Sequence, residues 1–201
     1  MLERKVRAAE STGPGHESIA SYAARLAART PTPGGGSAAG VVAALAAALG
    51  EMVLAYSIDP AKPAEELVAV NTLLKSGRAR FLELADEDAL SYDRVRQAKK
   101  FRKEHPNDPS ASTAYLQAVR GAAEVPLETA RRAVESAQRL DHVRTRTRAA
   151  LGSDLVTSLA LFRAAAEGAL ANVAINLDDL KAAGQPTDDL EAEVARLRAT
   201  G

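Results

Sequence analysis

The sequence predicts an all-α protein, an up-and-down bundle of about six helices with an Ala-rich helix at its centre. Three observations support this prediction. Apolar residues recur at the 3.6-residue spacing of amphipathic helices over long segments. No segment alternates β-branched and polar residues in the way that is typical of a strand. Alanine, the strongest helix former, makes up about a fifth of the chain.

Composition restricts the possible functions. Residues 17–201 are enough for one helical domain, whereas residues 1–16 are charged, end near a Gly-Pro-Gly turn and predict a flexible tail. Lys plus Arg and Asp plus Glu both number 26, so no net charge attracts nucleic acid or an acidic membrane. There is no cysteine, and the three histidines lack metal-ligand spacing, so we expect no metal. The chain opens with no signal peptide, and we expect a cytoplasmic protein.

The most informative stretch is residues 31–37, with the sequence PTPGGGS. It separates a first helix, residues 17–29, from the Ala-rich second helix, which runs to residue 56. We expect Ser37 to cap the second helix, whose N-terminal N–H groups suit an anionic or electron-rich ligand. A plain helix-to-helix turn is the alternative, but such a turn needs only one glycine. The residues expected to bind a ligand here are Pro33, Gly34, Gly35, Gly36 and Ser37.

The second helix is apolar on nearly every side, which indicates that other helices surround it. Its small side chains allow close approach, and a chain of this length has few helices to cover it. It therefore predicts a subunit contact, and we expect a homodimer. Although the segment is apolar, it contains Glu51 and many small residues, so it reads as a buried helix and not as a membrane span.

The third helix begins near Pro63 and carries one candidate acid. Its apolar stripe contains Leu67, Leu74, Phe81, Ala85 and Tyr92. Asp88 lies within about 60° of that stripe, which requires it to be paired, hydrogen-bonded or raised in pKa. A partly exposed carboxylate at the edge of the stripe is the alternative interpretation.

Local signals delimit the remaining helices. Asp108 and Pro109 predict the start of the fourth helix, and Pro126 should kink or divide it before Leu140. A further helix follows residues 152–154 and stops at Gly184, and a short amphipathic helix covers residues 187–200. Arginines 144, 146 and 148 read as a solvated segment, although one of them could reach an anionic ligand.

The helix after residue 152 has polar side chains on its inward face. Asn172 and Asn176 share one line with Leu161, Ala165 and Gly168, to within about 40°. They suit hydrogen bonding to a flat polar ligand, or alternatively to each other across a core. Asp154, at the helix start, is either a second candidate acid or a cap. It lies about 27 Å along the helix from Asn172, so the two serve different places or different subunits.

Several stretches together resemble a known family. In chain order they are PTPGGGSAA at 31–39 with Met52-Val53 beyond it, LADEDA at 84–89 with Tyr92, AAEVPL at 122–127, SDL at 153–155 and ANVAINL at 171–177. The set, spanning residues 17–182, resembles the cyclodeaminase/cyclohydrolase family of tetrahydrofolate enzymes. The resemblance implies an all-helical dimer that acts on a tetrahydrofolate derivative as substrate, with no further cofactor. Many members differ from this chain at two turns, residues 57–62 and residues 147–148.

The chemistry needs an acid–base group. A methenyl bridge between N5 and N10 is an amidinium-like cation, so water adds to its carbon and the adduct collapses with loss of one nitrogen. A carboxylate can move the protons and stabilise the cation. We therefore assign Asp154 and Asp88 as catalytic candidates and Asn172 and Asn176 to the pterin edge.

Three functions remain open from the sequence. Methenyltetrahydrofolate cyclohydrolase is favoured, because no transferase is attached to supply a formimino group. Formiminotetrahydrofolate cyclodeaminase shares the same site and releases ammonia. A folate-binding or non-catalytic helical scaffold is the third, and the two departures from the family pattern are its support.

Overall fold

The fold is a bundle of helices, as the sequence predicts. The structure is a computed structural model that describes residues 17–200, so the predicted tail, residues 1–16, lies outside the described residues. Between residues 17 and 200 there is no strand. The six α-helices are α1 (Ile19–Leu26), α2 (Gly35–Ser57), α3 (Glu65–Glu104), α4 (Pro109–His142), α5 (Gly152–Ala182) and α6 (Asp188–Thr200). Two single-turn 3-10 helices, Arg144–Arg146 and Ala149–Leu151, connect α4 to α5.

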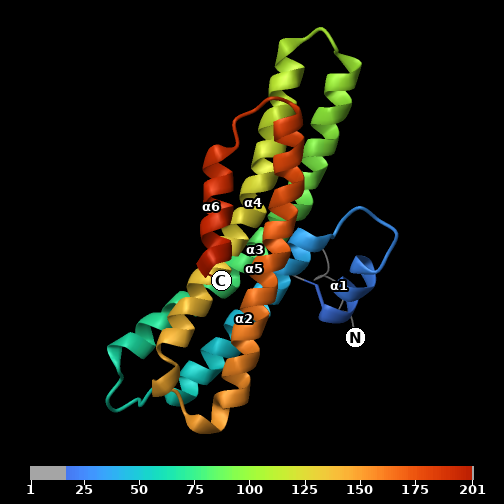
Figure 1. Ribbon diagram of the computed structural model, residues 1–201. Coiled ribbons are helices and arrows are strands. Elements are labelled where there is room, and N and C mark those ends of the chain that lie inside the picture. Colours follow the sequence, from blue (N-terminus) through green and yellow to red (C-terminus); the bar gives the residue numbers. More distant parts are fainter. Residues whose placement is uncertain (1–16, 201) are drawn as a thin grey trace, which may run out of the picture.

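Helices α2, α3, α4 and α5 pack lengthwise and form the body of the molecule (Figure 1). The hairpin between α3 and α4 projects beyond the other helices at the top of Figure 1, and α6 folds back beside α4 and α5. The short helix α1 stands to one side, near the N-terminal end of α2. The N-terminal end of α2 therefore lies partway along the bundle, where α3 and α5 pass on either side of it.

Helix α2 is the centre of the core, as its Ala-rich sequence predicts. Ala43, Ala46 and Ala47 are fully buried, and their small side chains let α3 and α5 approach closely. At Gly40 the approach leaves no room for a side chain, because a Cβ there would lie 2.8 Å from the carbonyl oxygen of Phe81. The Phe81 ring in turn packs against Phe162 of α5, with ring centroids 6.2 Å apart.

Two helical segments are long and apolar enough to cross a membrane by composition alone, Gly35–Ser57 and Ala149–Ala182. About half of each apolar window is buried inside the bundle, 50% and 44% respectively. Core helices of a helical bundle have this composition because neighbouring helices cover them.

Several local signals are confirmed. Asp108 caps α4 by accepting a hydrogen bond from the Ser110 N–H, with Pro109 in the first turn. Gly184 follows the end of α5 with a φ of 69°, a conformation that glycine adopts without strain. Helix α6 buries Leu190, Val194 and Leu197, as its pattern predicts.

Three predictions are wrong in detail. The N-cap of α2 is Gly34 and not Ser37, because the helix begins at Gly35 and Ser37 is already inside it. Of the two outcomes predicted for Pro126, a kink or a division of the helix, the division is wrong, because α4 continues through Pro126 to His142. Tyr92 does not continue the buried stripe of α3, because α3 extends past the core there and leaves the ring 44% exposed.

The close contact between α2 and α3 at Gly40 leads to a prediction about stability. Gly40→Ala should lower the free energy of unfolding by about 1–3 kcal/mol, because the new methyl group would overpack the contact between α2 and α3. Gly121→Ala is the matched control, since no atom lies within 4 Å of a Cβ at this position in α4. It should be stabilising by about 0.5–1 kcal/mol through helix propensity. Urea denaturation of both variants measures the two effects, and equal stabilities would contradict the close approach.

Candidate functional site

A cavity of about 600 Å³ opens beside the N-terminus of α2. Its walls come from the glycine turn, the second half of α3 and the end of α5, with one residue of α4. Its volume falls in the range of small-molecule sites, which is roughly 300–1,000 Å³. Several residues expected from the sequence line it, namely Gly34, Gly35, Asp88, Asn172 and Asn176. The structure thus brings together side chains that are far apart in the sequence.

Asp88 connects α3 to the start of α2. Gly34, the N-cap of α2, has no side chain to satisfy the first N–H groups of the helix. The Asp88 carboxylate instead lies against this helix start, since a Cβ at Gly36 would be 2.1 Å from its Oδ1, and the Ser37 N–H favours its charged form. The neighbouring Glu87 is held differently, by Arg80 at 2.6 Å. Asp88 therefore acts as a capping group supplied by another helix, and its carboxylate borders the cavity.

Burial shifts the acidity of Asp88. Removal of water from the carboxyl group raises its pKa, and the Ser37 N–H partly offsets that effect by stabilising the charged form. The net direction is upward from the ordinary aspartate value. A carboxyl group whose pKa moves toward neutrality exchanges protons more effectively near neutral pH.

Two of the three glycines, Gly35 and Gly36, leave space that neighbouring side chains occupy, whereas a Cβ at Gly34 would make only an ordinary contact of 3.7 Å. A Cβ at Gly36 would lie 2.1 Å from Oδ1 of Asp88, and a Cβ at Gly35 would lie 3.0 Å from Nδ2 of Asn172. Neither residue has a positive φ. The glycines are therefore needed for close approach and not for a left-handed backbone. Pro33, which precedes them, is buried, and Ser37 is completely buried.

Asn172 and Asn176 form the α5 side of the cavity. Nδ2 of Asn172 donates to the carbonyl of Gly168 at 2.8 Å, and Nδ2 of Asn176 donates to that of Ala122 at 3.2 Å. Among the described residues, neither side-chain oxygen accepts a hydrogen bond. Both amide oxygens are thus available as acceptors for a ligand.

Pro126 explains why the Ala122 carbonyl can accept a hydrogen bond from the Asn176 side chain. Proline has no N–H, so the carbonyl four residues earlier, that of Ala122, loses its helical partner. Nδ2 of Asn176 donates to that carbonyl, which satisfies it and ties α5 to α4 beside the cavity. The proline thus creates an acceptor that positions a residue of the site.

Other lining residues were not predicted as site residues from the sequence. They are Pro31, Thr32, Ser91, Tyr92, Val95, Arg96, Lys99, Ala122, Ile175 and Asp179. The five on α3 lie at three- and four-residue steps after Asp88, so helical spacing would have found them once Asp88 was chosen as the reference. Lys99 makes no ion pair within residues 17–200, and Arg96 pairs only with Asp93 there, at 3.4 Å. Two cationic side chains therefore line the cavity, together with the acidic Asp179.

Asp154 does not belong to this cavity. It lies in the first turn of α5, whose N-cap is Leu151, and makes no side-chain capping bond. The unbroken helix from Gly152 to Ala182 holds it 18 residues away from Asn172, about 27 Å along the axis. The capping alternative is therefore wrong, and within one subunit the two predicted acids do not meet.

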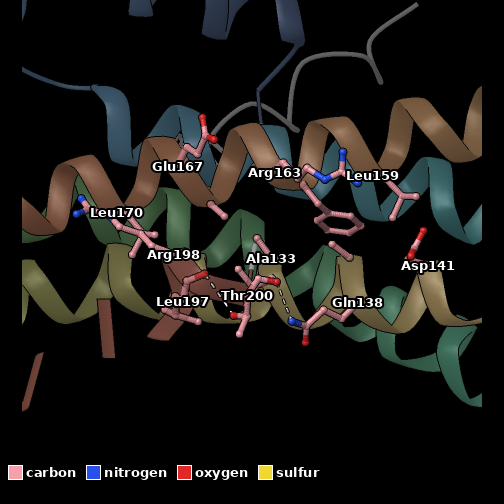
Figure 2. Close-up of a pocket in the computed structure, with 14 residues that line it drawn as sticks. Ala133, Gln138, Asp141, Leu159, Arg163, Glu167, Leu170, Leu197, Arg198 and Thr200 are labelled. Carbon is pink, nitrogen blue, oxygen red and sulfur yellow. Dashed lines mark hydrogen bonds between the residues drawn. The ribbon is translucent and has the colours of Figure 1, made fainter. Parts of the chain in front are cut away.

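A second cavity, of about 340 Å³, lies between α4, α5 and α6 (Figure 2). Its floor is apolar and includes Leu159 and Leu197, while Arg163, Glu167 and Arg198 lie on its rim. It contains none of the residues predicted for the site. We therefore take the cavity beside Asp88 as the candidate site.

The candidate site suits acid–base chemistry on a flat polar molecule. One half-buried carboxyl group is fixed at a helix N-terminus, and two amide oxygens lie on the opposite wall. Within residues 17–200, no group of three or more His, Cys, Asp or Glu side chains could hold a metal ion. The described groups are thus a proton-transfer group and hydrogen-bond acceptors.

Comparison with known proteins adds independent information. Residues 18–196 match the family described as Formiminotransferase-cyclodeaminase. A methenyltetrahydrofolate cyclohydrolase of Methylorubrum extorquens is 29% identical over 188 residues, which is 90% of each chain. The formimidoyltransferase-cyclodeaminase of Sus scrofa is 30% identical over 82% of this chain, and that of Rattus norvegicus is 30% identical over 90%. This chain spans only about a third of those two proteins, 31% and 33%.

The fold has a counterpart among solved structures. The crystal structure of formiminotetrahydrofolate cyclodeaminase from Thermotoga maritima superposes with a TM-score of 0.77 and 25% identity. The match covers 92% of this chain and 90% of that one. The likeness therefore extends over the whole bundle and is not limited to one helix pair.

The contact between Gly36 and Asp88 can be tested without a ligand. Gly36→Ala should push the carboxylate off the Ser37 N–H, which removes the cap of α2 and costs about 0.5–2 kcal/mol of unfolding free energy. The pKa of Asp88, followed by carboxyl NMR, should rise further because a stabilising donor is lost. Gly168→Ala is the control, since its Cβ would make an ordinary 3.8 Å contact with Ala39. An unchanged Asp88 signal in Gly36→Ala would refute the contact.

Proposed function

Because the chain belongs to the formiminotransferase-cyclodeaminase family, we propose that it hydrolyses 5,10-methenyltetrahydrofolate to 10-formyltetrahydrofolate in one-carbon metabolism. The observation that carries this proposal is the position of the Asp88 carboxyl group, which lines the cavity against the N-terminus of α2 and whose pKa burial raises. The Methylorubrum cyclohydrolase, matched over 90% of both chains, supports the hydrolytic reaction over ammonia release. A cytoplasmic location is part of the same proposal.

Asp88 has two tasks in this reaction. Its carboxylate accepts a proton from the water that adds to the methenyl carbon, which gives a neutral tetrahedral adduct. The carboxylic acid then donates that proton to N5 as the C–N5 bond breaks. The adduct hydroxyl loses its proton to solvent as the formyl C=O forms on N10. One water is consumed and one proton is released, so the step balances, and a positioned acid–base group contributes roughly 10²–10⁴-fold.

The remaining walls bind the rest of the molecule. The side-chain oxygens of Asn172 and Asn176 accept hydrogen bonds from the N–H groups of the pterin edge. The exposed backbone of the glycine turn, beside Asn172, offers a surface on which the flat ring lies. Arg96 and Lys99 hold the carboxylates of the glutamate tail at the rim.

The family resemblance and the surface of α2 support a homodimer. Val41, Leu45, Met52 and Tyr56 fall within about 60° of one line along α2. Leu45 is 46% exposed and Tyr56 is 59% exposed, although α2 is otherwise the core helix. Exposed apolar side chains in a line on the central helix are typical of a protein–protein contact. We propose that a second copy of the chain covers them and that the dimer buries at least about 1,600 Å² of surface in total.

Such a dimer gives Asp154 a role. Helices α2 and α5 are antiparallel, since Gly35 lies against Asn172 and the Ser158 hydroxyl bonds the Ala46 carbonyl. Asp154 is thus beside the second half of α2, and the glycine turn is at the opposite end. If two α2 helices cross antiparallel about Leu45, the Asp154 end of one subunit approaches the glycine turn of the other. We propose that Asp154 completes the partner's site as its second carboxylate.

Formiminotetrahydrofolate cyclodeaminase is the second candidate, and the Thermotoga maritima structure favours it. There the same acid would protonate departing ammonia as the methenyl bridge closes. One assay distinguishes the candidates: loss of methenyl absorbance on added methenyltetrahydrofolate indicates the cyclohydrolase, and ammonia release from the formimino derivative indicates the cyclodeaminase. Binding of folates without turnover would indicate a scaffold.

Asp88→Asn tests the acid. The amide keeps an oxygen for the Ser37 N–H, so the fold should survive while turnover falls by roughly 10²-fold or more. Because the pKa of Asp88 is higher in the folded than in the unfolded state, its ionisation lowers the stability of the fold at neutral pH. The neutral amide avoids that loss, so the melting temperature of Asp88→Asn should not fall below that of the wild type. The acidic limb of the wild-type activity profile should lie above the ordinary aspartate pKa. Asp178→Asn is the control, because Asp178 is an exposed aspartate of α5 that does not line the cavity. Near-wild-type turnover in Asp88→Asn would refute the scheme.

Mixing two inactive variants tests the shared site. Asp88→Asn and Asp154→Asn chains, combined in equal amounts and allowed to exchange subunits, should recover about a quarter of wild-type activity, because each mixed dimer holds one intact site. Each variant alone should stay inactive. No recovery despite exchange, or a monomer by sedimentation at micromolar concentration, would contradict the proposal.

A further inference from the structure

Helix α1 is attached to the bundle through a single buried side chain. Of its eight residues only Tyr22 is buried, at 7% exposure, whereas Ile19 remains 71% exposed. Residues 27–34 join α1 directly to the glycine turn. The attachment therefore lies beside the site and not elsewhere on the bundle.

The Tyr22 hydroxyl meets Ser37. The two oxygens are 3.2 Å apart in a buried hydrogen bond, and Ser37 has no exposed surface. Within residues 17–200 this is the only side-chain hydrogen bond of Ser37, so its hydroxyl depends on Tyr22 for a partner. The backbone N–H of Ser37 stabilises the Asp88 carboxylate. Tyr22 does not line the cavity, so it does not contact the proposed substrate.

We propose that Tyr22 is a positioning residue: its hydroxyl holds Ser37, whose N–H in turn holds the Asp88 carboxylate at the cavity. The inference rests on the proposed function for its catalytic consequence, but its structural part does not. Burial raises the pKa of the Tyr22 phenol, and the charge of Asp88 raises it further, which agrees with the proximity of the two side chains.

Other charged groups lie near the contacts that link Tyr22, Ser37 and Asp88. Glu17, which precedes α1, forms an ion pair with Arg25 of α1 at 3.1 Å. At the cavity rim, Asp179, Arg96 and Lys99 make no hydrogen bond or ion pair with Asp88 in the described part of the chain. Loss of the Tyr22 hydroxyl therefore acts on Asp88 through Ser37. A looser Ser37 N–H stabilises the carboxylate less, so the pKa of Asp88 should rise.

Tyr22→Phe tests the proposal, because it removes one oxygen and keeps the ring. We expect kcat to fall about 3- to 10-fold, the effect of one ordinary hydrogen bond, with KM nearly unchanged. The Asp88 pKa, measured by carboxyl NMR, should move upward. Tyr115→Phe is the control, since Tyr115 is a second buried tyrosine outside the cavity.

A double-variant cycle separates positioning from packing. Ser37→Ala should lower kcat as Tyr22→Phe does, and the two together should lower it no further than either alone, because both remove one contact. The double variant should also recover melting temperature, since no buried hydroxyl is left unpartnered.

Two results would overturn the proposal: a lower melting temperature in Tyr22→Phe with kcat and the Asp88 pKa unchanged, or additive effects in the cycle. If the protein turns over no folate, the proposed function fails, while the Asp88 pKa in Tyr22→Phe still decides whether Tyr22 positions Asp88.

Discussion

The contact between the N-terminus of α2 and the Asp88 carboxylate is the constraint on which the site depends. A helix that begins with glycines cannot cap itself, because it has no side chain to accept its first N–H groups. Asp88 supplies that acceptor from α3, and it can do so only because Gly36 leaves the space that a Cβ would take. One turn further, Gly40 lets the backbone of α3 approach, because a Cβ there would lie 2.8 Å from the Phe81 carbonyl oxygen.

This arrangement balances two opposed electrostatic effects. Burial disfavours the charged carboxylate, whereas the N–H of Ser37 and the positive end of α2 favour it. Burial prevails, so the group is less stable as an anion than an exposed aspartate is. A neutral residue would serve the fold as well at neutral pH. A carboxylate placed at a cost to stability is typical of a functional site.

The opposite wall of the cavity depends on an irregularity in α4. Pro126 removes one helical hydrogen bond, and the released carbonyl of Ala122 receives Asn176 from α5. Asn172 is held one turn away by its own helix, at the Gly168 carbonyl. Each amide nitrogen donates inside the protein, whereas neither amide oxygen accepts a hydrogen bond among the described residues, so both oxygens are open to a ligand. The internal hydrogen bonds of Asn172 and Asn176 therefore determine that this wall presents hydrogen-bond acceptors to a ligand.

The sequence by itself determined the helices and some faces. Periodicity, the Asp108–Pro109 start and the Gly184 stop are local signals, and the shared face of Asn172 and Asn176 follows from their four-residue spacing. Only the tertiary structure decided that Asp88, and not Asp154, borders the glycine turn. It also decided that Ser37 lies inside α2 and bonds Tyr22, and that the Ala122 carbonyl holds Asn176. These contacts join residues between 15 and 54 positions apart, and they depend on the axial register between packed helices. Periodicity specifies which side of a helix is buried, but it does not specify how far one helix slides along another, because apolar contacts are not directional.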